Sequence, residues 1–193
     1  MAELARLLGE RTVVTSIELR LAGLAARDQI AELPHRYATA YAELDLDALV
    51  ALYRPDVELL NGDTGRAALH AHFERGIRTG PGGGLDTVVL HTGNHVIQVT
   101  GADGAVGTVY CHVEVILRDG TGYYQAVRYT DSYCRRGDRW YFARQRTHEL
   151  CYGAPFASRP NGRPDADWPA RQIGRGTVPY RLPTWQEFWN AGG

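Results

Sequence analysis

Residues 88–99, VVLHTGNHVIQV, mark the point where the chain changes from helical to strand periodicity. Short valine-rich apolar runs bounded by glycine-rich turns are typical of a β-strand. The same stretch places two histidines, His91 and His95, in a segment that otherwise has the character of a buried strand. Three interpretations are open for them: a metal site, an acid/base catalyst, or histidines that are hydrogen-bonded in a core.

Three more strands are predicted after this one. They cover residues 105–117, 123–135 and 140–150. The connecting sequences GADG, RDGTG and RGDR have the composition of tight turns, so we expect consecutive strands to pair in an antiparallel sheet.

Helices are predicted in the first half of the chain. Apolar residues recur at spacings of three and four between residues 24 and 53, and Pro34 predicts a break or kink in that register or a helix that begins near it. A second short helix is expected with Asp45 as its N-cap. Residues 56–61, DVELLN, are predicted as a strand.

The order of these elements predicts an α+β fold. A third helix begins after Gly65, and the glycine-rich stretch 78–84 is predicted as a loop that leads into the strands. Helices followed by a run of antiparallel strands pack with a curved sheet around them. Such a sheet forms a cone with an interior.

The chain of 193 residues is long enough for one well-filled core and short for two. We expect an N-terminal arm at 1–23, one domain at 24–153 and a tail at 154–193 that is rich in Pro, Arg and Gly. Within the tail, PTWQEFWN predicts a short helix with three aromatic residues at helical spacing. That much aromatic surface should dock on the mouth of its own cone or on a neighbouring subunit.

The composition is that of an ordinary globular protein. Hydrophobic residues make up 44% and the formal net charge is −1, without the basic excess that nucleic-acid binding requires. All 21 cationic side chains are arginines, and the absence of lysine excludes Schiff-base chemistry and a P-loop.

Cysteine usage and hydropathy predict a cytoplasmic protein. Cys111, Cys134 and Cys151 are odd in number and lack CxxC spacing, so neither a disulfide framework nor a zinc knuckle is indicated. No apolar run approaches a membrane span, and the N-terminus lacks a cleavable apolar region. We expect no membrane partner.

A metal site is disfavoured by the spacing of the histidines. On a regular strand His91 and His95 share a face but lie about 13 Å apart, too far to chelate one ion, although a bulge at 93–94 would relax this. On a helix His70 and His72 point away from each other, which favours a solvated helix face. We expect no metal.

Alternation along the strands separates a core face from a polar face. In residues 105–117, one face carries only apolar side chains and Cys111, whereas the other includes His112 and Glu114. His112 is therefore interpreted as structural.

Asp131 lies between two tyrosines on one face of an apolar strand, residues 123–135. The pKa of such a carboxyl rises if it is buried without a cation. The alternative is a structural ion pair, although the nearest arginine in sequence, Arg128, faces the other way.

Three segments resemble the SnoaL-like branch of the NTF2-like superfamily: RYATAYAELDLDALVALYRPDVEL, LHTGNHVIQVTGADGAVGTVY and YTDSYCRRGDRWYFARQR. The resemblance covers about residues 24–153. Members of this branch include polyketide cyclases, scytalone dehydratase, bile-acid dehydratases, hexachlorocyclohexane dehydrochlorinase and, more distantly, ketosteroid isomerase. The resemblance implies a conical barrel whose pocket lies between the sheet and the long helix, no cofactor, and a homodimer or homotrimer.

The resemblance also implies roles for individual residues. In dehydratase-like members a histidine at the position of His91 is the general acid or base, and it would point into the cone. These members pair it with an aspartate where this chain has Ala42. Asp131 matches the position from which ketosteroid isomerase donates a hydrogen bond to an oxyanion. Tyr41 and Tyr53 match places where a phenol holds a substrate oxygen or water.

The expected site therefore has two sets of residues. The catalytic set is His91, Asp131 and Tyr41. The substrate-binding set is Tyr53, His95, Tyr129 and His148.

Two classes of function remain open. The first is a cofactor-independent dehydratase, isomerase or cyclase that removes an acidic proton from an apolar oxygenated small molecule of polyketide, steroid or terpenoid type. The second is a non-catalytic binding protein or the small subunit of a ring-hydroxylating oxygenase, because one fold serves many functions. The residue Ala42 favours the second class.

Overall fold

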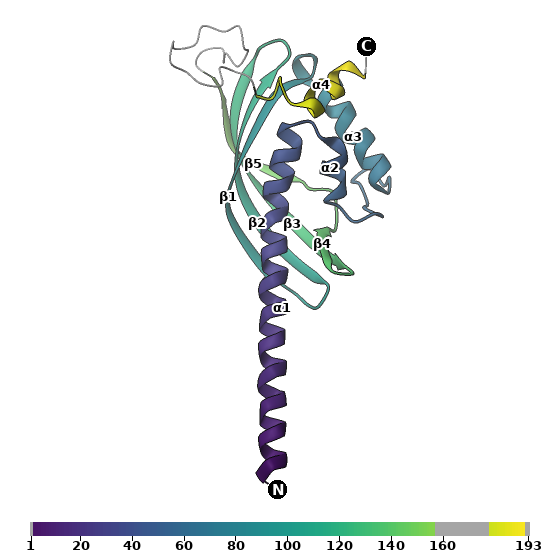
Figure 1. The fold of residues 1–193 in the computed structure, drawn as a ribbon. Helices are drawn as coiled ribbons and strands as arrows, with labels where there is room; N and C mark the ends of the chain where they lie inside the picture. The colour runs from purple at the N-terminus through teal and green to yellow at the C-terminus, as the bar shows by residue number, and fades with distance from the viewer. Residues whose placement is uncertain (1, 157–177, 192–193) are drawn as a thin grey trace.

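The computed structural model describes residues 2–156 and 178–191, with side chains from residue 17 onward. The elements before the sheet are α1 (Ala2–Ala42), α2 (Leu46–Ala51), α3 (Arg66–Thr79) and the 3₁₀ helix η1 (Pro81–Gly83). The strands and the last helix are β1 (Leu85–Val99), β2 (Gly104–Leu117), β3 (Gly122–Arg136), β4 (Arg139–Phe142), β5 (His148–Pro155) and α4 (Pro183–Asn190). Figure 1 shows the curved sheet wrapped around α1, with α2 and α3 on the opposite side, so the predicted α+β cone is confirmed.

The sheet is antiparallel and runs in the order β1-β2-β3. The predicted strand at 140–150 is wrong, because two strands, β4 and β5, occupy this region with residues 143–147 between them. Both pair with β3, β4 along residues 133–136 and β5 along residues 123–129. The chain therefore leaves the edge of β3 after β4 and rejoins it at β5.

The pairing of β1 with β2 changes phase near the middle of β1. Thr92 pairs with Cys111 and His95 pairs with Val109, so β1 has one extra residue in this interval. Such a bulge inverts the alternation of side chains along a strand. The side chains that face the helices are Val88 and Leu90 before the bulge and His95 and Ile97 after it.

Helix α1 is longer and more regular than its sequence predicts. It runs from Ala2 to Ala42, so the predicted arm at 1–23 and the first helix of the domain form one element. The predicted break is wrong, since Pro34 lies inside the helix. A proline removes one backbone hydrogen bond, but Ile30, Leu33 and Pro34 are buried against the body, and this packing holds the helix together.

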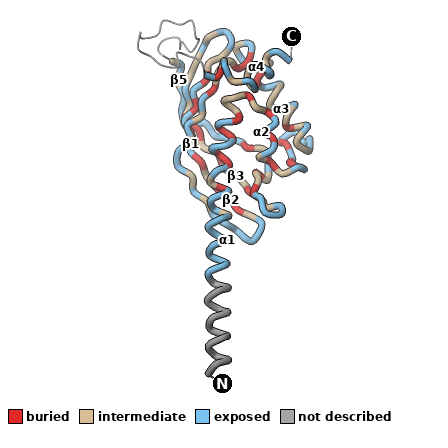
Figure 2. The backbone as a smooth tube through the Cα atoms, viewed as in Figure 1, coloured by how far each residue is buried: buried red, intermediate tan, exposed pale blue. Residues whose placement is uncertain are grey.

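The core lies between α1 and the concave face of the sheet, as the buried segments in Figure 2 show. Asp45 caps α2 as predicted, because its Oδ1 accepts a hydrogen bond from the Ala48 amide at 2.9 Å. The predicted strand at 56–61 is wrong, since this segment forms only an isolated bridge between Glu58 and Thr64.

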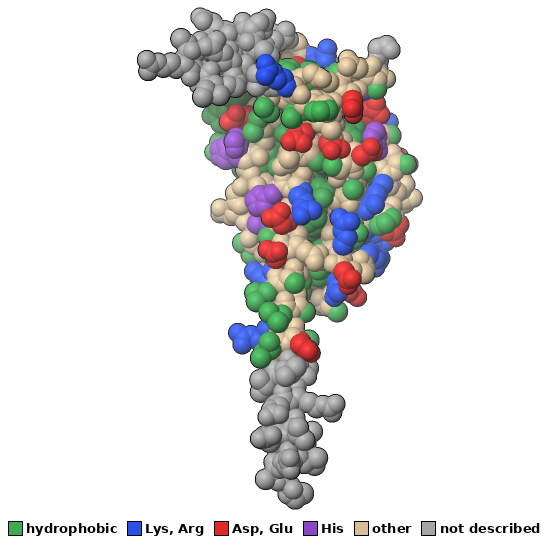
Figure 3. Space-filling model, viewed as in Figure 1, with side chains coloured by type: hydrophobic (Ala, Val, Ile, Leu, Met, Phe, Trp, Pro, Cys, Tyr) green, Lys and Arg blue, Asp and Glu red, His purple; other side chains and the backbone are tan. Residues whose placement is uncertain are grey.

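The first part of α1 leaves the body of the molecule (Figure 1). Hydrophobic side chains gather at this neck (Figure 3), and those of Ile17, Leu19, Leu21 and Leu24 are more than half exposed. Within the described ranges, no helix combines the length and the apolar character needed to cross a membrane.

Helix α4 forms at the predicted PTWQEFWN sequence and docks on its own chain. The Thr184 hydroxyl donates to the Glu43 carbonyl at the end of α1, and the Trp185 indole donates to the Asp86 carbonyl at the start of β1. The Arg78 guanidinium of α3 lies 4.2 Å from the centre of the Phe188 ring. The tail between residues 157 and 177 lies outside the described residues.

Candidate active site

A cavity of about 310 Å³ opens at the end of the cone where α1 and α3 end and β1 begins. Its walls are mostly aliphatic: Leu85, Val88, Leu90, Val113, Val115, Leu117 and Val127. Its polar groups are Tyr37, Tyr41, Tyr123, Gln125, Tyr129 and His148. An apolar cavity with a few converging polar groups is the usual form of a small-molecule site.

The alternation of β3 places three polar side chains in this cavity. Tyr123, Gln125 and Tyr129 are two, four and six residues apart and so share the concave face. His148, the first residue of β5, is the direct partner of Tyr129 and therefore stands on the same face. The centres of these two rings are 5.6 Å apart. The imidazole and the phenol thus form one side of the cavity wall.

Three phenols of the cavity, those of Tyr37, Tyr41 and Tyr129, remain protonated well above neutral pH. Burial raises the pKa of Tyr129 to about 12, with the Arg146 cation acting in the opposite direction. Burial also raises the pKa of Tyr41 to about 12, and that of Tyr37 lies well above its ordinary value for the same main reason. These hydroxyls can therefore act as hydrogen-bond donors to a ligand oxygen.

Aromatic packing holds Tyr41 in place. Its ring stacks on Tyr37 with centroids 5.9 Å apart and meets the edge of Phe73 at the same distance. Tyr41, Tyr129 and His148 are the three predicted site residues that line the cavity.

His91 does not point into the cone, and this expectation is wrong. Its side chain is 60% exposed and lies on the outer face of the sheet, with Nε2 3.8 Å from the Glu114 carboxylate on β2. The cause is strand alternation, since its neighbour Leu90 takes the inward position. An imidazole on this face cannot reach a ligand in the cavity.

His95 lies on the inner face but does not border the cavity. Its Nε2 is 3.0 Å from the Tyr133 hydroxyl, and Gly107 on the paired strand leaves room for this contact. Burial lowers the pKa of His95, an effect that Asp131 partly offsets. The substrate-binding role expected for His95 has no support in this geometry.

Asp131 forms a buried ion pair and does not line this cavity. Its two carboxylate oxygens accept hydrogen bonds from Nε and the terminal nitrogen of Arg146 at 2.9 and 2.8 Å, and a third from the Tyr133 hydroxyl at 3.2 Å. Both side chains of the pair are at most 1% exposed. The catalytic role expected for Asp131 has no support from the geometry of this cavity, and its cation is Arg146, not Arg128.

Tyr53 is also placed differently from the expectation. Its ring is completely buried, 5.2 Å from the centre of Phe142, and it does not line the cavity. Among the described residues its hydroxyl has no hydrogen-bond partner. Tyr53 is a core residue.

Several residues of the site were missed in the sequence. Tyr123 and Gln125 carry a usable signal, because they alternate with Tyr129 on one predicted strand. Tyr37 lies one helical turn before Tyr41. Arg146 has no local signal, since the loop that brings it to Asp131 exists only because β4 and β5 are separate strands.

The histidines do not gather into a metal site in the described parts of the chain, where no three His, Cys, Asp or Glu side chains are close enough to hold an ion. His70 lies 3.9 Å from the Glu74 carboxylate one helical turn away, as on a solvated helix face. His72 contacts the Gln145 amide at 2.9 Å.

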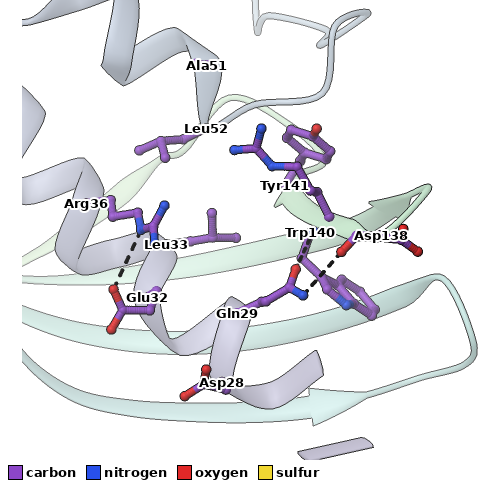
Figure 4. Close-up of a pocket in the computed structure, with 11 residues that line it drawn as sticks. Asp28, Gln29, Glu32, Leu33, Arg36, Ala51, Leu52, Asp138, Trp140 and Tyr141 are labelled. Carbon is purple, nitrogen blue, oxygen red and sulfur yellow. Dashed lines mark hydrogen bonds and ion pairs between the residues drawn. The ribbon is translucent and has the colours of Figure 1, made fainter. Parts of the chain in front are cut away.

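A second hollow of about 240 Å³ lies between α1, the end of α2 and the β4 hairpin (Figure 4). The Gln29 amide bridges this gap, since its nitrogen donates to the Asp138 carbonyl at 3.2 Å and its oxygen accepts from the Trp140 amide at 3.2 Å. Arg36 and Glu32 are engaged with each other, 3.6 Å apart. This hollow is separate from the cone interior and shares no lining residue with it.

Comparison with known proteins defines the class. Residues 22–146 match the SnoaL-like domain family, so the chain belongs to this family. Its fold is the NTF2-like cone that its structural neighbours share. No curated protein is similar enough in sequence to match the chain.

Three solved structures illustrate the likeness. The first is a hexachlorocyclohexane dehydrochlorinase (LinA) of type 2, with 20% identity, a TM-score of 0.61 and coverage of 76% of this chain and 99% of that one. The second is a protein from Novosphingobium aromaticivorans provisionally named a scytalone dehydratase, with 20% identity, a TM-score of 0.59 and coverage of 72% and 92%. The third is an NTF2-like protein with a cystatin-like fold from the same organism, with 24% identity, a TM-score of 0.53 and coverage of 71% and 89%. At these identities the likeness concerns the fold.

Proposed function

We propose that this protein is a cofactor-independent acid/base enzyme that removes and returns a proton on a neutral, mostly apolar, oxygenated small molecule. The observation that carries the proposal is the pairing of His148 with Tyr129 on the cavity wall, with ring centres 5.6 Å apart. Dehydration, isomerisation and cyclisation all begin with such a proton transfer. Polyketide, steroid or terpenoid ketones are suitable ligands.

In this proposal His148 is the group that carries the proton. An imidazole can accept and release a proton near neutral pH, which makes it the usual general acid or base. Tyr129 and Tyr41 donate hydrogen bonds to the oxygen on which negative charge develops, a role for which their protonated phenols are suited.

The charge around the cavity supports a neutral ligand. Arg146 lies behind the rings of Tyr37 and Tyr129, and its charge is paired with Asp131. No arginine is among the residues that line the cavity in the described parts of the chain. An anionic ligand would lose its hydration without gaining a cation.

The names of the structural neighbours support the same class of reaction. One is a dehydrochlorinase and another is provisionally named a dehydratase, and both names denote eliminations. An elimination needs a base and a dry pocket, and neither requirement involves a cofactor.

The test is solvent deuterium incorporation into a panel of neutral cyclic ketones. We expect the native protein to label at least one of them, and His148→Gln to slow the labelling by at least about 100-fold. His91→Gln is the matched control, because this histidine lies on the outer face, and its rate should equal that of the native protein. An accepted ketone that His148→Gln labels at the native rate would remove His148 as the base.

A second candidate function is non-catalytic ligand binding or service as a small subunit of an oxygenase. It is favoured by Ala42, which ends α1 where dehydratase-like members carry an aspartate, and whose methyl group cannot orient an imidazole. A ligand that binds in the cavity with no exchange would support this candidate. Size-exclusion chromatography of the lone chain would show whether it assembles without a larger partner.

A further inference from the structure

A buried ion pair lies at the break between β4 and β5. Asp131 and Arg146 are 15 residues apart in sequence and are joined by two parallel hydrogen bonds of 2.9 and 2.8 Å. Asp131 stands in the part of β3 that neither β4 nor β5 covers, since β4 ends at the partner of Tyr133 and β5 begins at the partner of Tyr129.

The ion pair lies close to the start of β5. Arg146 precedes His148 by two residues, at the end of the segment that crosses from one strand to the other. In the described residues, the only backbone hydrogen bond between the crossing segment 143–147 and β3 is at its start, from the Ala143 amide to the Ser132 carbonyl, at 2.8 Å. The side-chain fork of Arg146 therefore fixes the point at which β5 rejoins the edge of β3.

The guanidinium also holds the tyrosines of the cavity. Its central carbon lies 3.8 Å from the centre of the Tyr129 ring, 4.5 Å from Tyr37 and 4.8 Å from Phe142. Tyr129 is the residue that His148 faces across the β3–β5 pair. One side chain thus contacts the ring opposite His148 and anchors the strand that carries His148.

Stability alone does not account for a pair of this kind. Removing two charges from water costs more than burying apolar groups of the same size, so a buried pair is retained more readily for the geometry it specifies. The remaining acceptor capacity of Asp131 is used by the Tyr133 hydroxyl, which in turn contacts His95. The planar fork of arginine suits this task because it holds both carboxylate oxygens at once.

We propose that Arg146, held by Asp131, is a positioning residue that sets the register of β5 and the orientation of Tyr129, and so places His148 on the cavity wall. This inference rests on the proposed function in that it assigns a purpose to the position of His148. In this role Arg146 does not touch the ligand.

The test follows the position of the His148 ring by NMR, which needs no substrate. In the native protein we expect a nuclear Overhauser contact between the ring protons of His148 and Tyr129. Two variants address the pair: Asp131→Leu with Arg146→Met, which removes both charges while keeping apolar volume, and Arg146→Lys, which keeps the cation but lacks the fork. We expect either folded variant to lose this contact.

Leu49→Ala is the matched control, because Leu49 is fully buried in α2 and its truncation lowers stability away from this strand pair. It should keep the contact between His148 and Tyr129. With a ketone that the native protein labels, the variants of the pair should also lose about 100-fold in exchange rate, the cost of misplacing a catalytic group.

The outcomes distinguish the two proposals. A contact that persists unchanged in a folded variant of the pair overturns the positioning role of Arg146, whatever the activity. A contact that is lost as expected, in a protein that labels no ketone, supports the positioning role and counts against the proposed function.

Discussion

His91 and His95, four residues apart on β1, lie on opposite faces of the sheet. Residues four apart on a regular strand share a face, but the bulge between Thr92 and His95 inserts one residue and inverts the alternation. His91 is left beside Glu114 on the outer face, whereas His95 contacts Tyr133 inside. The two imidazoles therefore differ in accessibility and in hydrogen bonding.

Chemical modification should separate these two histidines. The His91 ring is exposed and lies 3.8 Å from the Glu114 carboxylate, whereas the His95 ring is partly buried and hydrogen-bonded to Tyr133. We expect diethyl pyrocarbonate to modify His91 faster than His95, as measured by mass spectrometry of the peptides at short reaction times. Equal rates would contradict the orientation of β1 described above.

His95 should make the stability of the protein depend on pH. Burial lowers its pKa below the ordinary value of 6.5, while Asp131 acts in the opposite direction. The unfolded chain therefore binds a proton at this residue at a higher pH than the folded protein does. As the pH falls through about 6.5, the unfolded state gains protons first and the free energy of unfolding decreases.

The measurement is the urea midpoint at about pH 7.5 and about pH 5.5. We expect the native midpoint to fall with pH and the fall to be smaller in His95→Gln, which retains an amide to contact Tyr133. His91→Gln provides the comparison at an exposed site. The same dependence in all three proteins would exclude His95 as the cause.

The general fold could be predicted from the sequence, because periodicity reports which residues face a core. A helix before residue 42, the cap at Asp45 and the run of antiparallel strands follow from local pattern, whereas the full length of α1 does not. Pro34 was misjudged because tertiary packing against the sheet outweighs the lost hydrogen bond. The separation of β4 from β5 accompanies the Asp131–Arg146 pair, whose members are 15 residues apart in sequence and so share no short window.

The candidate site was only partly predictable, because local periodicity places some of its residues and long-range strand pairing places the others. Tyr41 and Tyr129 line the cavity as expected, since helix and strand periodicity carry over directly. The resemblance predicts that His91 points inward. A shift of one residue in the register of a strand moves a side chain to the other face of the sheet, so resemblance alone does not determine its direction. A sequence with Gly93 and Asn94 is compatible with a bulge, but whether one forms depends on the partner strand.

Breaking the buried ion pair should lower stability strongly. Either Asp131→Leu or Arg146→Met leaves one member without its partner in a site where both side chains are at most 1% exposed. We expect each single change to cost about 3–5 kcal/mol in the free energy of unfolding, and Asp131→Leu with Arg146→Met to cost less than the sum. Chemical denaturation of the four proteins gives the coupling directly. Additive costs would mean that the two residues do not act as a pair.

Gly107 on β2 should not tolerate a side chain, because atoms of β1 and β3 lie close to its Cα. A Cβ at this position would lie 2.9 Å from the Val96 carbonyl oxygen, 3.0 Å from the Tyr133 ring and 3.1 Å from Nε2 of His95. The backbone of β1 cannot retreat without breaking its pairing with β2. We therefore expect Gly107→Ala to lower the free energy of unfolding by about 1–3 kcal/mol, as overpacking of a core does.

Gly101→Ala is the matched control for this prediction. Gly101 lies in the turn between β1 and β2, and an added Cβ there meets nothing within 4 Å. Both variants remove the same backbone freedom from the unfolded chain, so their difference isolates the contact with Val96, Tyr133 and His95. The urea midpoints of the two variants should differ, with Gly107→Ala the lower. Equal midpoints would show that β1 can shift at this point, and the hydrogen bond between His95 and Tyr133 would then not be held by close packing.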